Sequence, residues 1–253
     1  MSDELYSAAL VAARDCMGIK PQERVLIVTD EPLRAIGYAL WRATKDLGCE
    51  VLLVEILPRK TNGEEPPQEV AELMKMVDVV LCPTSKSLTH TDSRRAASAK
   101  GVRVATLPGV TEEIMVRCMN ANYNRIAERT FKLCGMLEET SVVRVTAPRG
   151  TDITLPIKGR QAHASSGLFR EKGQWGNLPT GEAYLAPLEA RSNGVVVVDG
   201  SPDNTAEVVE EWIKRETIDH RPQTTDRVGC ETFGGRIPRL RDDSRLATAF
   251  WRA

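Results

Sequence analysis

Histidine is widely used in metal and acid–base sites, and this sequence contains three. They are His90, His163 and His220, and no pair has the HExxH spacing that presents two metal ligands from one helical face. His90, within THTDSR, is either a contact for substrate or a phosphate-like group, or a neighbour of threonines that cap the next helix. His163, within QAHASSG, is either a site residue or a loop histidine. The histidines by themselves predict no metal centre.

The cysteines do not form a metal-binding or redox motif either. They include no CxxC pair and no tight cluster. The first five lie in apolar periodic segments, where a reduced cysteine acts as a small buried hydrophobic residue. We therefore expect free thiols and a reducing compartment. The six are Cys16, Cys49, Cys82, Cys118, Cys134 and Cys230.

Composition argues against several classes of partner. The 253 residues are 42% hydrophobic and 27% charged, and the formal net charge is −1. Such a balance gives no electrostatic reason to expect nucleic acid or an anionic membrane as a partner. The start, MSDELYSAAL, lacks the pattern of a secretory signal, and the apolar runs are of strand length. We expect a cytoplasmic protein.

The first part of the chain alternates between helical and strand patterns. The β-branched run RVLIVT at residues 24–29, for example, is typical of a fully buried strand. Strands that alternate with helices predict βαβ units around a parallel sheet. We expect an α/β fold whose residues 1–139 form a doubly wound, Rossmann-like or flavodoxin-like domain. Its predicted helices are 4–17, 31–47, 67–76, 89–100, 111–119 and 123–138. Its predicted strands are 24–29 and 49–56, both expected to be buried, and 78–82 and 102–107.

Helix signals support these boundaries. Asp30 is a predicted N-cap with Pro32 in the first turn, Thr111 starts another helix, and Asn122 is in position to cap a third. The sequence contains no GxGxxG after the first strand and no GxxxxGK[ST]. Dinucleotide and P-loop readings are therefore disfavoured.

The pattern changes near residue 140. Residues 141–146 and 152–157 alternate between apolar and polar side chains around the turn at 148–150, which predicts a half-buried hairpin. Strands without intervening helices continue to residue 199. We expect the start of a second, mostly β (α+β) domain at residues 140–201. Residues 202–253 form an atypical tail, rich in arginine and without an alternating strand pattern.

Three stretches together identify a family resemblance. They are SKSLTHTDSR at residues 85–94, ATLPGVTEE at 105–113 and GNLPTGEAYLAP at 176–187, the last being the most specific. In this order they resemble the aminopeptidase T family of metallopeptidases, in its shorter version, from about residue 1 to about residue 201. The resemblance implies a metal-dependent aminopeptidase that acts on peptides and forms a homodimer.

The resemblance also implies site residues. The glutamate of the NLPxGE motif is a metal ligand in that family, and the matching residue is Glu182, with zinc or cobalt as the expected divalent ions. Pro179 and Gly181 restrict the turn in front of it, and metal ions held by a carboxylate can acidify water and polarise a peptide carbonyl. Asn177, Tyr184 and His163 are the candidate substrate-binding residues. The alternative for Glu182 is a solvated loop carboxylate.

The remaining ligands of such a site do not follow in the sequence. The resemblance implies a later strand of the GTxHxA type, and the sequence after Ser201 contains none. We therefore expect impaired catalysis, with catalytic residues unassigned, and a C-terminal segment that is degenerate or read in a shifted frame. One alternative is a non-catalytic remnant that binds a small anion near residues 84–87 or 30–31. Another is the related iron-dependent ring-cleaving dioxygenase.

Overall fold

The computed structural model describes residues 2–148, 150–189, 191–199 and 246–252. These belong to two compact units. The first unit comprises Met1–Met136 and Ala162–Tyr184, and the second comprises Leu137–Gln161 and Leu185–Ala253. His220, Cys230 and most of the predicted tail lie outside the described residues.

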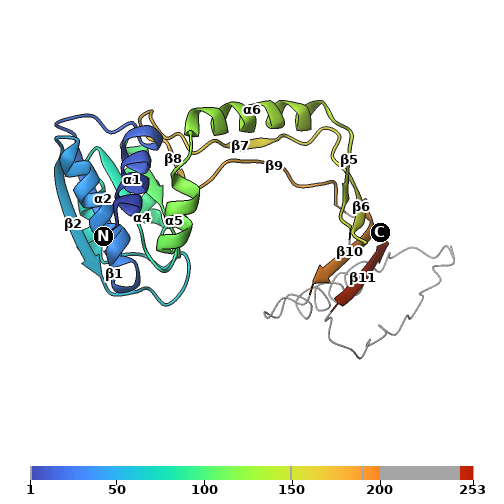
Figure 1. Cartoon of the computed structure of the whole chain (residues 1–253), viewed down its shortest axis with the longest axis horizontal. Helices are drawn as coiled ribbons and strands as arrows, with labels where there is room; N and C mark the ends of the chain where they lie inside the picture. Colours follow the sequence, from blue (N-terminus) through green and yellow to red (C-terminus); the bar gives the residue numbers. More distant parts are fainter. Residues whose placement is uncertain (1, 149, 190, 200–245, 253) are drawn as a thin grey trace. The chain divides into compact units, whose positions relative to one another are not determined.

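A five-stranded parallel sheet forms the centre of the first unit (Figure 1). Its strand order is β2-β1-β3-β4-β8. Its inner strands are apolar runs whose side chains are buried on both faces, as expected for a parallel sheet between helices. The α/β fold predicted from the alternating pattern is confirmed. The strands are β1 (Arg24–Asp30), β2 (Glu50–Ile56), β3 (Val79–Cys82), β4 (Arg103–Thr106) and β8 (Trp175–Asn177).

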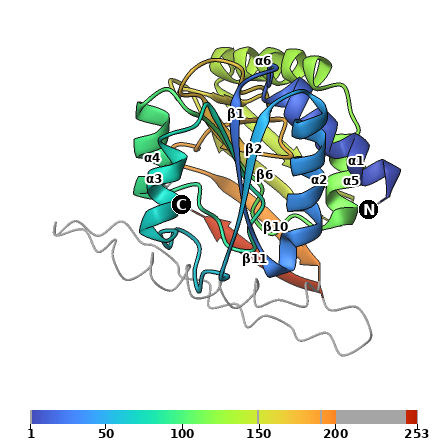
Figure 2. The same cartoon turned by 90° about the vertical axis from the view of Figure 1, so that its left-hand side faces the viewer.

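Helices cover both faces of this sheet (Figure 2). One apolar cluster lies under α1 (Asp3–Leu10), its π-helical continuation η1 (Val11–Cys16), α2 (Arg34–Asp46) and α5 (Glu112–Met119). The opposite cluster lies under α3 (Gln68–Met74) and α4 (Asp92–Ala99). The first unit is therefore doubly wound, with two separate cores that share the sheet.

Most of the predicted helix starts are those of the structure. Thr91 Oγ1 accepts from the amide of Arg94, Thr111 Oγ1 accepts from that of Ile114, and both are N-caps. Asn122 Oδ1 likewise accepts from the amide of Arg125 at the start of α6 (Tyr123–Glu139). Of the two threonines beside His90, Thr91 thus caps α4, as one of the two readings of that segment expects.

Two details differ from the prediction. Asp30 ends β1 and stands at the N-cap position of a short 3-10 turn (Glu31–Leu33) that leads into α2, with Pro32 in the first turn, but its side chain makes no capping bond. Strand β2 is not fully buried, because it is an edge strand with β1 as its one neighbour in the sheet. Leu52 on this strand is 47% exposed.

Residues 162–184, which the sequence pattern places in the β-rich part, belong to the first unit. Strand β8 pairs in parallel with β4, in a register that places Val104 opposite Trp175 and Thr106 opposite Asn177. Phe169 and Leu178 lie in the core of the first unit. A short ladder of β7 (His163–Ser165) and β9 (Glu182–Tyr184) flanks this strand in the sequence. Backbone pairing between segments some 70 residues apart leaves no local mark in a sequence.

The second unit contains an antiparallel sheet in the order β11-β10-β6-β5. The predicted hairpin is confirmed as β5 (Val142–Thr146) and β6 (Asp152–Pro156), although β5 is mostly exposed instead of half-buried. Strand β10 (Asn193–Asp199) pairs on its other side with β11 (Leu246–Arg252). The end of the chain therefore contains a strand where the pattern predicted none.

The five cysteines that the structure describes are free. Cys16 and Cys82 are buried, and burial raises the pKa of the Cys82 thiol to about 12. Burial also raises the pKa of Cys16, with a smaller contribution from Asp15. These thiols are packing residues. None of the described helices combines the length and apolar character needed to cross a bilayer.

Gly37 provides a test of how α2 packs on the sheet. A Cβ at Gly37 would lie 2.8 Å from Cβ of Thr29 on β1, whereas one at Gly135 of α6 would meet nothing within 4 Å. We expect Gly37→Ala to lower the free energy of unfolding by about 1–3 kcal/mol through overpacking. The control Gly135→Ala should raise it by up to about 1 kcal/mol, because alanine favours a helix. Urea unfolding followed by circular dichroism measures both, and equal effects would contradict this packing.

Thiol reactivity tests the assignment of Cys16 and Cys82 as core residues. At pH 8 a thiol reagent should modify both only after urea unfolds the chain, whereas the half-buried Cys49, Cys118 and Cys134 should react earlier. Burial raises the pKa of Cys82 from 9.0 to about 12 in the folded state. The buried neutral thiol therefore contributes fully to the free energy of unfolding below pH 9, and this contribution is lost as the pH rises toward 12. Mass spectrometry of labelled peptides identifies the sites, and rapid native labelling of Cys82 would refute the assignment.

Candidate functional site

Several polar side chains of the first unit lie at the carboxyl ends of its parallel strands. Helix α2, which connects β1 to β2, and α3, which connects β2 to β3, contribute to apolar clusters on opposite faces of the sheet. The strand order therefore reverses between β1 and β3. In open α/β sheets ligands bind outside the carboxyl ends of the strands at such a point.

Asp30 and Ser85 meet in this crevice. Asp30 is fully buried, and its Oδ2 accepts from the Ser85 amide at 2.7 Å and from Ser85 Oγ at 2.6 Å. Its Oδ1 has no hydrogen-bond partner within the described structure. A small anion near residues 30–31 or 84–87 is therefore disfavoured, because a buried carboxylate already occupies the Ser85 donors an anion would need. Asp30 instead anchors the loop that follows β3.

That loop leads to a hydroxyl–amide cluster at the ends of β4 and β8. Asn177 Oδ1 lies 2.9 Å from Thr89 Oγ1 and 2.7 Å from Thr106 Oγ1, and the two hydroxyl oxygens are 2.8 Å apart. Both threonines are buried, whereas Asn177 is exposed. The oxygen of this exposed side chain accepts from two hydroxyls and no described residue accepts from its amide nitrogen, so its two N–H groups are available to a ligand.

A stacked cation borders this cluster. The Arg94 guanidinium carbon lies 3.7 Å from the centre of the Trp175 ring, and its Nε donates to the Thr89 carbonyl at 2.7 Å. The His90 ring meets Trp175 edge-on at 6.4 Å. Arg94 is 5% exposed and Trp175 is 42% exposed. An aromatic surface, a buried cation and an imidazole therefore share the end of the sheet with Asn177.

The other predicted site residues lie together on the β7–β9 ladder. Glu182 is directly across from Ser165, and Tyr184 is across from His163, with ring centres 5.6 Å apart. Successive odd or even positions of a strand share a face, so Glu182, Tyr184 and His163 point to one side of the ladder. All three are exposed or partly exposed, and Glu182 forms no ion pair with a described residue.

This ladder does not complete a metal centre within the described part of the chain. Glu182 and His163 are of ligand type, but a site requires at least three or four protein ligands. Among residues 2–148, 150–189, 191–199 and 246–252, no three His, Cys, Asp or Glu side chains gather to hold an ion. The described residues therefore do not fit a metal ion, and the role expected for Glu182 stays a prediction.

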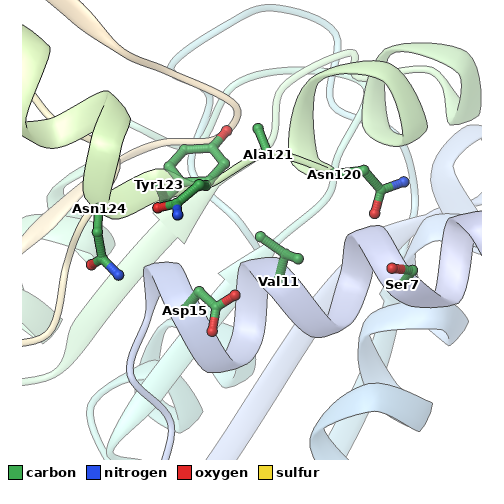
Figure 3. Close-up of a pocket in the computed structure, with 8 residues that line it drawn as sticks. Ser7, Val11, Asp15, Asn120, Ala121, Tyr123 and Asn124 are labelled. Atoms are coloured by element: carbon green, nitrogen blue, oxygen red, sulfur yellow. The ribbon is translucent and has the colours of Figure 1, made fainter.

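A second feature of the first unit is an open hollow between α1–η1 and the connection from α5 to α6 (Figure 3). Its volume is about 550 Å³. Two of its polar side chains already have protein partners: Arg14 binds the Asp15 carboxylate, and Arg170 donates to Asn124 Oδ1. The hollow therefore has less to offer a ligand than the carboxyl edge. It is lined by Ser7, Val11, Asp15, Asn120, Ala121, Asn122, Tyr123 and Asn124.

The family of this chain follows from a match over most of its length. The model of the 2,5-dihydroxypyridine 5,6-dioxygenase family, NicX, matches residues 7–215. The chain belongs to this family. The NicX match includes β1 to β10, and with them the Asn177 cluster and the β7–β9 ladder. No curated protein matches the sequence.

Two solved structures share the fold with this NicX family member. One is 2,5-dihydroxypyridine dioxygenase from Pseudomonas putida KT2440, with a TM-score of 0.61 and 15% identity over 78% of this chain and 60% of that one. The other is AmpT from Thermus thermophilus, with a TM-score of 0.51 and 15% identity over 77% of this chain and 64% of that one. The chain thus spans less than two thirds of either relative. At this identity the likeness to AmpT concerns the fold, while the family model is that of the dioxygenase.

Sequence reasoning found part of this arrangement. Asn177 was predicted as a site residue and lies at the carboxyl edge, whereas Glu182, Tyr184 and His163 lie on the neighbouring ladder. Arg94 and Thr106 were not singled out, although both belong to stretches quoted for the resemblance. The signal for Arg94 was a charged residue three positions after the helix cap Thr91, and that alone is compatible with a solvated surface.

The hydroxyl–amide cluster can be tested by removing one hydroxyl. We expect Thr106→Val, which keeps the side-chain shape, to lower the free energy of unfolding by about 1 kcal/mol because Asn177 loses one donor. The control is Thr61→Val, on an exposed loop, which should stay within about 0.5 kcal/mol of the parent. Thermal and urea unfolding measure both. A Thr106→Val protein as stable as the parent would show that the bond contributes nothing.

Proposed function

We propose that this protein takes part in oxygen-dependent ring cleavage of a hydroxylated nitrogen heterocycle, as the name of its family describes. The observation that supports this most is the family match over residues 7–215. The carboxyl edge of the sheet is in keeping with it, because it presents an exposed indole beside donors for ring oxygens. Trp175 and Asn177 are the two residues that offer these groups.

The described residues would recognise and orient the ring. The Asn177 amide, held by Thr89 and Thr106, can donate to a ring hydroxyl or carbonyl oxygen without further ordering. The exposed part of Trp175 offers a flat apolar surface for the ring. The Asp30–Ser85 contact holds the loop leading to Thr89 and so supports this geometry. These roles concern binding and orientation.

A metal cofactor is in keeping with the dioxygenase family and with AmpT. The described residues group no three metal ligands, so the roles proposed for them are binding and orientation of the ring. Glu182 and His163, on one face of the β7–β9 ladder, are the described residues nearest to a ligand arrangement. Their contribution to a complete site depends on further ligands.

A metal-dependent aminopeptidase is the second candidate. The specific observation that favours it is the GNLPTGE segment, which starts β9 with an exposed glutamate free of ion pairs to described residues. The fold shared with AmpT is compatible with it. The two candidates differ in what they consume: a ring and oxygen in one, a peptide bond and water in the other.

Parallel assays of the full chain distinguish these candidates. With added Fe(II) we expect 2,5-dihydroxypyridine and dissolved oxygen to disappear in equal amounts, measured by ring absorbance and an oxygen electrode. Leucine p-nitroanilide with zinc or cobalt should give no nitroaniline. Hydrolysis that Glu182→Ala abolishes would instead establish the aminopeptidase. Absence of both activities would favour a binding protein.

The same assay tests the recognition role. Asn177→Ala should lower kcat/KM for the ring substrate by about 10-fold, because one donor to the substrate is lost. The control is Gln68→Ala, an exposed amide on α3, which should leave kcat/KM unchanged. If Asn177→Ala kept the parent kcat/KM, Asn177 would not be a recognition residue, and the proposed reaction class would not be affected.

A further inference from the structure

The guanidinium of Arg94 is buried, yet most of its donors are unused. Its Nε donates to the Thr89 carbonyl, and its plane lies 3.7 Å from the Trp175 ring centre. Neither Nη1 nor Nη2 bonds to a described residue. Neither belongs to the buried atoms without a partner, so both reach the surface. Four N–H groups of a side chain that is 5% exposed therefore have no hydrogen-bond partner among the described residues.

No carboxylate of the described structure balances this charge. Asp92 on the same helix pairs with Arg95 at 2.7 Å, and Glu65 accepts from the amides of Asp92 and Ser93. Burial, and then the nearby Arg95, lowers the pKa of Arg94, so the surroundings oppose its charge. Arginine stays protonated under such conditions. A buried, unpaired cation is costly, and an anion from outside would relieve that cost.

The groups around Arg94 suit a flat ligand. Trp175 presents the uncovered part of its ring, and the His90 ring stands edge-on to it. The side-chain amide of Asn177 lies on the same face of β8 as Trp175, two residues along the strand. The α4 amides of Asp92, Ser93 and Arg94 are already taken by Glu65 and Thr91, so the helix start adds no anion site of its own.

We propose that Arg94 and Trp175 form a binding site for a small aromatic carboxylate. The carboxylate accepts from Nη1 and Nη2 in a forked pair, which is the geometry that a guanidinium favours. The aromatic ring lies against the exposed indole, and Trp175 also holds the guanidinium plane in place. This goes beyond the proposed function, because 2,5-dihydroxypyridine has no carboxylate. It stands or falls independently of ring cleavage.

Binding of benzoate and benzamide to the full chain tests this site. The two ligands share ring and shape, and only benzoate is charged at pH 7. In ¹⁵N-labelled protein, the indole N–H signal of Trp175, assigned through Trp175→Phe, reports contact. We expect benzoate to shift this signal and to bind about 10-fold or more tightly than benzamide, because the forked pair needs a carboxylate.

Variants of two adjacent arginines localise the effect. Arg94→Gln should weaken benzoate binding by about 10-fold or more, whereas Arg95→Gln, an exposed neighbour on α4, should stay within about two-fold. Arg94→Lys keeps the charge for the case in which Arg94→Gln does not fold, and it should bind benzoate several-fold less tightly because lysine cannot form the fork. Circular dichroism checks folding.

Three outcomes would overturn the inference. Equal affinity for benzoate and benzamide would remove the role of charge. An unshifted Trp175 signal at saturating benzoate would place binding elsewhere. Equal losses in the Arg94 and Arg95 variants would indicate general surface attraction instead of a built site.

Discussion

The pairing of β8 with β4 is the contact on which the candidate site depends. Three residues of β8 extend the parallel sheet of the first unit, although some 70 residues separate them from β4 in the sequence. This register places Asn177 beside Thr106 and brings Trp175 against Arg94 of α4. The buried Phe169 and Leu178 tie the same segment to the apolar core. Without this strand the carboxyl edge would keep Asp30 and Ser85 but lose its aromatic surface and its side-chain amide.

The site combines rigid polar anchors with open groups. Asp30 holds the loop after β3 through Ser85, and the two threonines hold Asn177, so buried bonds order the residues whose outer atoms face solvent. Such ordering is typical of ligand sites, because orientation entropy is then lost on folding instead of on binding. The β7–β9 ladder differs. Its Glu182 and His163 are of ligand type but have no third partner among the described residues. The described residues therefore form a recognition surface, whereas they do not form a metal site.

The fold was largely predictable from local patterns. Apolar periodicity and cap residues placed the helices of the first unit, and Thr111 and Asn122 cap where expected, whereas α4 begins three residues later than predicted, after Thr91. The errors arose at positions whose structure depends on residues that are distant in the sequence. Asp30 looks like a cap in sequence but is drawn to Ser85, and β2 looks buried because its apolar run does not reveal an edge position. Strand β11 was missed, since it is defined by pairing with β10.

By itself, the sequence determined the doubly wound unit, the free cysteines, the hairpin of β5 and β6, and the GNLPTGE segment as a place of interest. These depend on period, turn chemistry and composition, which are local properties. Only the tertiary structure decided that Asn177 belongs to the end of a parallel sheet while Glu182 and His163 share a separate ladder. It also showed that Arg94 is buried without a counter-ion among the described residues. Burial and pairing arise between distant segments, so neither can be read from residue type and spacing.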